Sequence, residues 1–162
     1  MRRWHNAPMN KVDLQHLAPY EEDFALWSAE QAALIRAGKF DRVDLENVAE
    51  EIESLGRGNK SEIVSRMTII LVHLLKWQFQ PERASNSWAA SILEGRIRIA
   101  DLLAESPSLR DYPAQALHRA YRAAPLAAAG ETGLSLKTFP VECPYTADQV
   151  LDEAFFPGKR PE

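Results

Sequence analysis

The chain contains a single cysteine, Cys143, among its 162 residues. A lone cysteine excludes an internal disulfide framework and a zinc site built from several thiolates. Long hydrophobic runs are also missing: the longest mostly apolar stretch, residues 67–75, is far below the roughly 18 residues that a membrane span needs. The arginines at positions 2 and 3 are not followed by a hydrophobic segment, so no secretory signal is predicted. We therefore expect a cytoplasmic protein with no membrane contact.

Sequence motifs of familiar enzyme classes are missing as well. The chain has no Gly-rich phosphate-binding loop, no G-x-S-x-G nucleophile motif, no H-E-x-x-H zinc motif and no dinucleotide-binding fingerprint. We accordingly predict no cofactor, and the sequence favours a non-catalytic protein over an enzyme.

Positive charge is in the minority. The net charge is −4, which argues against broad nucleic-acid binding because such proteins neutralise phosphates with excess Lys and Arg. The charge is uneven: residues 20–62 are strongly acidic, whereas residues 83–122 carry an excess of arginine. Charge matching between helices explains this pattern, and weak nucleic-acid contact is the alternative. The arginines concerned are Arg83, Arg96, Arg98, Arg119 and Arg122.

What the sequence does contain is helical periodicity. Hydrophobic residues make up 46% of the chain, apolar residues recur at helical spacing, and no segment alternates as a strand. We predict an all-α fold, a compact antiparallel bundle of five or six helices. The expected organisation is an irregular N-terminal arm over residues 1–18, a single helical domain over residues 19–157 and a C-terminal tail over residues 158–162.

Local signals give the expected helix boundaries. The first helix begins near Pro19 and stops at Gly38, and the third runs from about Lys60 to Phe79, where Pro81 ends it. Between these, residues 56–59 (GRGN) favour a short turn, with a continuous bent helix as the alternative. Further caps are expected at Asp41 or Asp44, at Ser85 or Asn86, at Asp111, and at Thr146 with Gln149 as a capping box, and Pro125 should kink or end a helix.

The second predicted helix has a narrow apolar seam beside a carboxylate-rich face. We expect the seam to dock this helix against the third, antiparallel to it. Glu46, Glu50 and Glu53 would then lie where they can pair with Arg66 or His73. The seam consists of Leu45, Val48, Ala49, Ile52 and Leu55.

Glu50, Glu53 and His73 are the only specific chemical candidates. A metal or acid–base site would need them to converge across helices, but the Glu-x-x-His spacing of bundle metal sites does not occur. The sequence favours a structural role, in which His73 bonds a carboxylate or a backbone carbonyl. A second candidate is a ligand pocket near Pro81, lined by His73, Trp77, Arg83 and Trp88; packing of the corner by these aromatic residues is the simpler explanation.

Four stretches together resemble a known family: YEEDFALWSAEQAALIRAGKF, DLENVAEEIESLG, HLLKWQFQPERASNSW and TGLSLKTFPVECPYTADQVLDEAFFP. They are similar to the bacterial "domain of unknown function 29" family over roughly residues 19–157. The resemblance implies an all-helical single domain and no assigned activity.

Three functional hypotheses remain open. The preferred one is a small non-catalytic interaction or regulatory domain that binds another protein or a second copy of itself. The rivals are an enzyme or metal-binding bundle that uses Glu50, Glu53 and His73, and weak nucleic-acid contact through the arginines.

Overall fold

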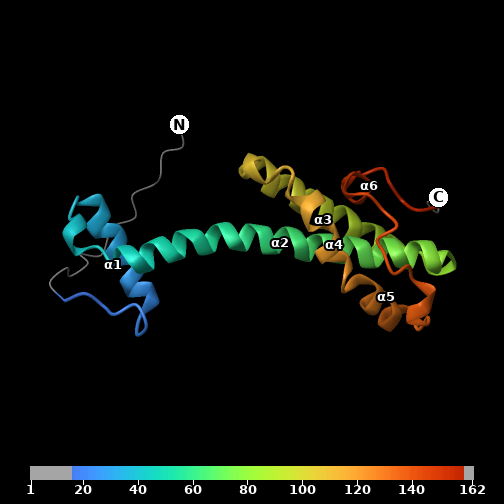
Figure 1. Ribbon diagram of the computed structural model, residues 1–162, viewed down its shortest axis with the longest axis horizontal. Coiled ribbons are helices and arrows are strands. Elements are labelled where there is room, and N and C mark those ends of the chain that lie inside the picture. Colours follow the sequence, from blue (N-terminus) through green and yellow to red (C-terminus); the bar gives the residue numbers. More distant parts are fainter. Residues whose placement is uncertain (1–15, 159–162) are drawn as a thin grey trace. The chain divides into compact units, whose positions relative to one another are not determined.

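The longest element of the structure is one helix, α2 (Leu45–Phe79), shown in Figure 1. The computed structural model describes residues 16–158, and within them the chain forms six α-helices, short 3-10 turns and no strand, which confirms the all-α prediction. None of these helices in the described part of the chain is long and apolar enough to cross a membrane. The other α-helices are α1 (Phe24–Arg36), α3 (Asn86–Glu105), α4 (Tyr112–Tyr121), α5 (Ala124–Thr132) and α6 (Ala147–Leu151).

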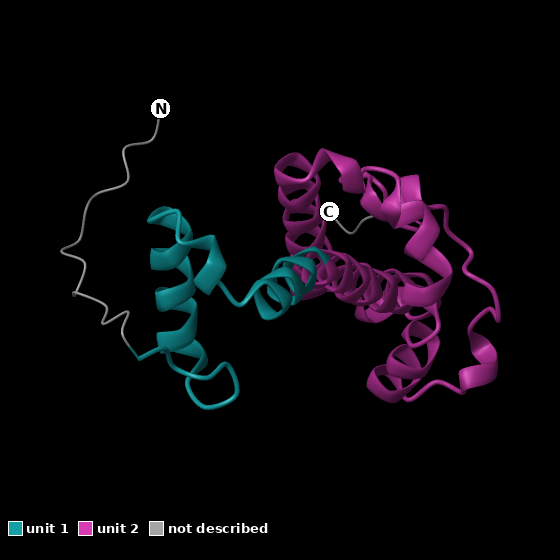
Figure 2. Cartoon of the chain, turned by 60° about the vertical axis from the view of Figure 1, so that its left-hand side comes forward, with its two compact units in different colours: residues 1–56 teal, residues 57–162 magenta. Residues whose placement is uncertain are grey.

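The chain forms two compact units, unit 1 (residues 1–56) and unit 2 (residues 57–162), coloured separately in Figure 2. Unit 1 contains α1 and the first turns of α2. Unit 2 contains the rest of α2 and α3 to α6. The single domain expected over residues 19–157 stays a prediction. The expected arm and tail lie almost wholly outside the described residues.

Most helix ends fall where local chemistry predicts. Asp44 caps α2 by accepting the Asn47 backbone N–H at 3.3 Å. Ser85 caps α3 through the Trp88 N–H at 3.4 Å. Thr146 and Gln149 form the predicted capping box at the start of α6. These caps satisfy backbone donors that a first helical turn leaves without partners, and Pro125 lies in the first turn of α5, so the preceding helix does end before it.

The first helix begins later than the sequence suggests. Residues 19–22 form a turn in which the Pro19 carbonyl accepts the N–H groups of Glu22 and Asp23. The helix begins at Phe24, because the Asp23 side chain accepts the Leu26 N–H at 2.9 Å. Gly38, with a φ of 69°, ends this region as predicted.

One helix replaces two that the sequence predicts. Because α2 runs from Leu45 to Phe79 without a break, the predicted turn at residues 56–59 is wrong and the continuous-helix alternative is confirmed. A glycine inside a helix costs only about 1 kcal/mol relative to alanine, which the long flanking helical segments offset. A Cβ at Gly56 or Gly58 would meet nothing within 4 Å, so close packing does not require either glycine.

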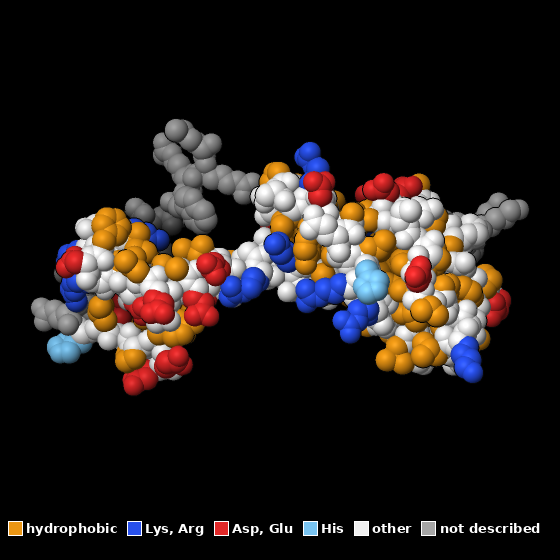
Figure 3. Space-filling view, in the orientation of Figure 1, with side chains coloured by type: hydrophobic (Ala, Val, Ile, Leu, Met, Phe, Trp, Pro, Cys, Tyr) orange, Lys and Arg blue, Asp and Glu red, His pale blue; other side chains and the backbone are white. Residues whose placement is uncertain are grey.

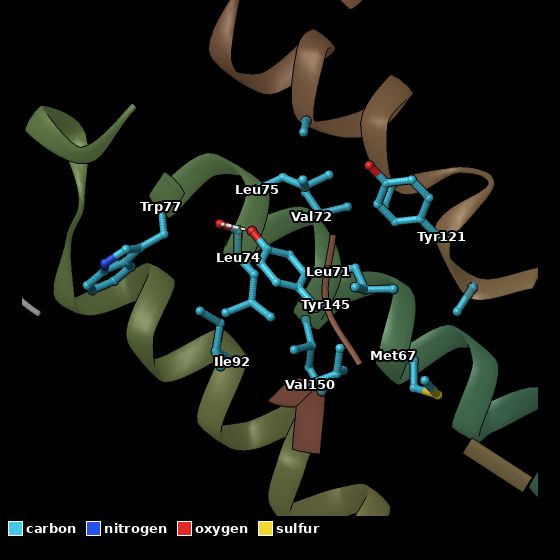
Figure 4. Close-up of a cluster of buried hydrophobic side chains, with 14 of the residues drawn as sticks. Met67, Leu71, Val72, Leu74, Leu75, Trp77, Ile92, Tyr121, Tyr145 and Val150 are labelled. Carbon is cyan, nitrogen blue, oxygen red and sulfur yellow. Dashed lines mark hydrogen bonds between the residues drawn. The ribbon is translucent and has the colours of Figure 1, made fainter. Parts of the chain in front are cut away.

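Unit 2 contains an extended hydrophobic core. The buried face of α2 supplies its centre, with Met67, Leu71, Leu74 and Leu75 almost fully enclosed by side chains from α3 and from the chain after α3 (Figure 4). The Tyr145 hydroxyl donates to the Leu74 carbonyl at 3.2 Å, so the C-terminal segment is hydrogen-bonded to α2 as well as packed on it. Burial of this apolar surface is the main favourable contribution to the stability of unit 2.

Helices α2 and α3 approach each other closely at Gly95. A Cβ placed at Gly95 would lie 2.8 Å from Cγ1 of Ile70, well inside van der Waals contact. Glycine at this position therefore lets the two backbones come together, and it explains why a residue with poor helix propensity lies inside α3.

Candidate functional site

Polar contacts hold unit 1 together. The Gln31 side-chain oxygen accepts the Asp44 backbone N–H at 2.8 Å, and the Trp27 indole N–H donates to the Asp44 carboxylate at 3.3 Å. Glu30, which is also buried, accepts the Ala18 backbone N–H at 2.7 Å. These bonds fix α1 against the start of α2 and against the segment before α1.

Tyr20, in the segment before α1, contacts both α1 and the start of α2. Its hydroxyl donates to the Glu51 carboxylate at 2.5 Å, and its ring packs edge-on against Trp27 with centroids 4.8 Å apart. The hydrogen bond to Glu51 is the main cause that raises the pKa of Tyr20, to about 12. Tyr20 therefore keeps its proton at neutral pH and continues to donate this bond.

An apolar groove of about 410 Å³ lies between α1 and the first turns of α2, entirely within unit 1. Trp27 and Ile35 contribute from α1, and Val48, Ile52 and Leu55 contribute from α2. Ile52 is 64% exposed and Leu55 is 74% exposed, so the groove is accessible to solvent. The remaining lining residues are Ser28, Gln31, Ala32 and Glu51.

The part of the chain that forms this groove is rich in carboxylates. Residues 16–56 carry ten carboxylates against three Lys and Arg, whereas residues 57–158 carry eleven of each. In Figure 3 acidic side chains gather over the part of the surface that unit 1 forms. The acids are Glu21, Glu22, Asp23, Glu30, Asp41, Asp44, Glu46, Glu50, Glu51 and Glu53, and the bases are Arg36, Lys39 and Arg42.

Three residues of the predicted seam, Val48, Ile52 and Leu55, line the groove. The sequence correctly places apolar residues on one face of this part of α2, but the expected docking against an antiparallel third helix is wrong, because both predicted helices are parts of α2. Leu45, Ile52 and Leu55 are therefore exposed instead of buried.

The metal or acid–base hypothesis requires Glu50, Glu53 and His73 on facing helices. All three lie on α2, the two glutamates in unit 1 and His73 in unit 2, so the facing helices that the hypothesis requires do not exist. Among residues 16–158, no group of three or more His, Cys, Asp or Glu side chains could hold a metal ion. His73 is half-buried, and its Nδ1–H donates to the Ile69 carbonyl at 2.9 Å, which confirms the expected bond to a backbone carbonyl.

A family model for a domain of unknown function, DUF29, matches residues 19–156. The chain belongs to the DUF29 family. The resemblance predicted from the sequence is thereby confirmed, and the matched region includes parts of both units of this DUF29 domain. No curated protein and no solved structure matches the chain.

The residues of the predicted ligand pocket of this DUF29 domain lie in different surroundings. Trp77 is only 2% exposed and packs on Phe156 with centroids 5.0 Å apart, so its ring is part of the core. Trp88 is half-buried, and its ring lies under the Lys76 ammonium group at 4.3 Å. Arg83 is exposed in the turn after Pro81.

Lys76 is a buried cation that the sequence analysis missed. Its Nζ donates to the Glu131 carboxylate at 2.6 Å, a salt bridge between residues 55 positions apart. Since the Lys76 side chain is 7% exposed, the pairing and the Trp88 ring compensate for its lost hydration. The DUF29 domain uses this pair to attach α5 to α2.

The five arginines considered for nucleic-acid contact do not form one exposed strip. Arg96 is only 2% exposed, and Arg98 pairs with Glu62 at 2.9 Å. Arg119 and Arg122 are exposed and line a shallow depression beside Val64 and Leu126. Arg96 is therefore too buried to contact a nucleic acid, and the charge of Arg98 is balanced by Glu62.

Arg96 instead holds the C-terminal segment of the DUF29 domain. Its guanidinium group donates to four backbone carbonyls, those of Val150 at 2.8 Å, Phe155 at 2.9 Å, Gln149 at 3.3 Å and Glu153 at 3.4 Å. Burial lowers the pKa of Arg96, to about 10, so the group remains charged at neutral pH. The carbonyls at the end of the short helix α6 and in the segment after it thus find a donor that they would otherwise lack.

Cys143 has the environment of a structural cysteine. Its thiol is half-buried and donates to the Tyr145 carbonyl at 3.4 Å. Burial raises the pKa of the Cys143 thiol, which disfavours the thiolate that a nucleophile needs.

Proposed function

We propose that this DUF29 domain is a non-catalytic protein-interaction domain whose binding surface is the apolar groove of unit 1. The observation that carries the proposal is the exposure of large aliphatic side chains around a defined groove in a unit with little core of its own. Seven of the twelve exposed large hydrophobic residues lie within residues 16–56, although this segment is the smaller part of the described chain. Concentrated apolar exposure of this kind is typical of protein-binding surfaces.

Several further features support a binding role over a catalytic one. The candidate acid–base residues are not on facing helices, and the thiol of Cys143 is poorly suited to nucleophilic attack. A free cysteine that pairs with no other cysteine suits a reducing compartment, which supports a cytoplasmic location.

Site-specific photo-crosslinking in cells that express the full chain tests this function. A photo-reactive amino acid at position 52, in the groove, should give a discrete crosslinked species. The same amino acid at position 97 is the matched control, because Ile97 is 54% exposed on α3, far from the groove in sequence and in the other unit. The substitution Leu55→Asp should abolish the crosslink from position 52. Equal crosslinking from positions 52 and 97, or none from position 52, would overturn the proposal.

A further inference from the structure

A shallow depression of about 460 Å³ lies on unit 2, where residues of α4 and α5 meet α2. Thr68, one of its lining residues, joins two of these helices: its hydroxyl lies 2.9 Å from the Val64 carbonyl on α2 and 3.0 Å from the Ala120 carbonyl on α4. Leu126, near the start of α5, is 67% exposed. The lining residues are Val64, Thr68, Arg119, Arg122, Ala123 and Leu126.

The two arginines of the depression have no acidic partner. Arg119 and Arg122 lie three residues apart and therefore on the same side of α4. Both are exposed, neither forms an ion pair within residues 16–158, and the lining contains no Asp or Glu. Arg98 of the same unit differs, because it pairs with Glu62 at 2.9 Å. Two guanidinium groups that the chain leaves unneutralised favour an anionic ligand.

Positive charge extends from the depression along α2. Lys60 lies one helical turn before Val64, and its ammonium group is 5.4 Å from the centroid of the Tyr112 ring at the start of α4. Figure 3 shows Lys and Arg side chains together over this part of α2 and α4. An acidic ligand would therefore meet a third cation on the same side of unit 2.

The open form of the depression and its apolar residues favour a protein segment as the ligand. Small-molecule sites enclose most of their ligand, whereas Arg119, Arg122 and Leu126 are all exposed here. No aromatic side chain lines the depression, so a nucleic-acid base would find no ring on which to stack. Val64 and Leu126 instead suit an apolar side chain of a protein.

We infer that this depression of unit 2 binds a segment of another protein in which Asp or Glu side chains flank an apolar one. The carboxylates accept hydrogen bonds from Arg119 and Arg122, whose guanidinium groups suit bidentate contact. The apolar side chain packs on Val64 and Leu126. The site goes beyond the proposed function, because it lies in the other unit and shares no residue with the groove of unit 1.

Two short designed peptides provide the probe for the full chain. Both contain the same leucines, and they differ only in having Glu or Gln on both sides of each leucine. Fluorescence anisotropy should show the Glu peptide binding at least about tenfold more tightly than the Gln peptide at low salt. The difference should shrink as salt is raised, because the charges are exposed. Equal binding of the two peptides, or no binding of the Glu peptide, would overturn the inference.

Variants of exposed residues locate the contact. Arg119→Gln combined with Arg122→Gln should remove the preference for the Glu peptide, and Leu126→Ser should weaken both peptides several-fold. The control combines Arg83→Gln with Arg110→Gln, two exposed arginines of unit 2 outside the depression, and removes the same net charge. Equal losses in both double variants would show that only net charge matters and would overturn the inference.

The remaining measurements separate this site from other occupants and from the groove. Ile52→Ser should leave the Glu peptide bound; loss of binding would place the peptide in the groove of unit 1, which overturns this inference and supports the proposed function. Tighter binding of a single-stranded oligonucleotide, removed by the Arg119 and Arg122 double variant, would overturn the protein partner in favour of a nucleic acid. Self-association in sedimentation that the same variant removes would overturn it in favour of a second copy.

Discussion

Unit 1 and unit 2 are held together by different kinds of interaction. Unit 2 encloses a large cluster of aliphatic and aromatic side chains, whereas in unit 1 the described part buries only Trp27 and Leu34 among its large apolar residues. Unit 1 relies on hydrogen bonds that involve Gln31, Asp44 and Tyr20. Such bonds contribute roughly 0.5–1.5 kcal/mol each, so unit 1 has the smaller reserve of stability. The difference shows how one chain can combine a well-packed unit with a unit that leaves an apolar groove exposed.

The largest effect should come from the core of unit 2. Leu71→Ala removes a fully buried side chain and leaves a cavity, at an expected cost of about 2–5 kcal/mol in the free energy of unfolding. Chemical denaturation followed by far-UV circular dichroism measures this cost. In unit 1, Ile52→Ala should lower the free energy of unfolding by less than about 0.5 kcal/mol, because that side chain is exposed. Similar costs for the two variants would contradict it.

The second largest effect should come from removing the hydrogen bonds of Arg96 within unit 2. Arg96→Met removes the donor for four carbonyls while keeping a side chain of similar length, at an expected cost of about 2–4 kcal/mol. The lost stability should be accompanied by faster hydrogen exchange at residues 149–156. Arg96→Lys retains the charge and should recover only part of the loss, since one ammonium group cannot reach all four carbonyls. Unchanged exchange in that segment would show that Arg96 does not hold it.

A smaller effect of opposite sign is expected at the boundary of the two units. Gly56→Ala and Gly58→Ala should each stabilise α2 by about 0.5–1 kcal/mol, because alanine has the higher helix propensity and a Cβ there meets nothing within 4 Å. Slower hydrogen exchange at residues 54–60 should accompany the gain. Gly95→Ala is the contrasting control and should destabilise, because its Cβ would collide with Ile70. A loss of stability from the first two substitutions would mean that α2 is not helical at this point.

The smallest effect concerns acid and should be confined to unit 1. The hydrogen bond from the Asn47 side chain is the main cause that lowers the pKa of Asp44. A lowered native pKa gives stability that is present above the unfolded pKa of about 3.9 and is lost as the pH falls through the native value. The Trp27 indole N–H resonance should therefore shift below about pH 4, since this group donates to Asp44. In Asp44→Asn the acid-dependent shift should disappear; its persistence would assign the titration to another group.

Local chemistry allowed much of the fold to be predicted. The caps at Asp44, Ser85 and Thr146 depend on side chains within three residues of the backbone groups they satisfy, so the sequence identifies Thr146 and limits each of the other two caps to a pair of candidates. The prediction of a turn at residues 56–59 was wrong because the low helix propensity of glycine is a weak signal, which the long helical segments on both sides override.

The candidate site was harder to predict for a different reason. Periodicity identified the apolar face of α2 correctly, but it cannot tell whether that face is covered by the same chain or exposed for a partner. The roles of Lys76 and Arg96 were equally hidden, because their partners lie more than fifty residues away along the chain. An arginine inside the helical pattern of α3 has the same sequence signature whether it faces solvent or a set of carbonyls.

Helix α2 carries a practical consequence for dissecting this chain. The boundary between the units falls at Gly56, inside a continuous hydrogen-bonded helix rather than in a linker. A fragment that begins at residue 57 would expose four backbone N–H groups without the Asp44 cap, and a fragment that ends at residue 56 would leave four carbonyls without N–H donors downstream. An exchange of either unit, in evolution or in the laboratory, should therefore keep α2 whole.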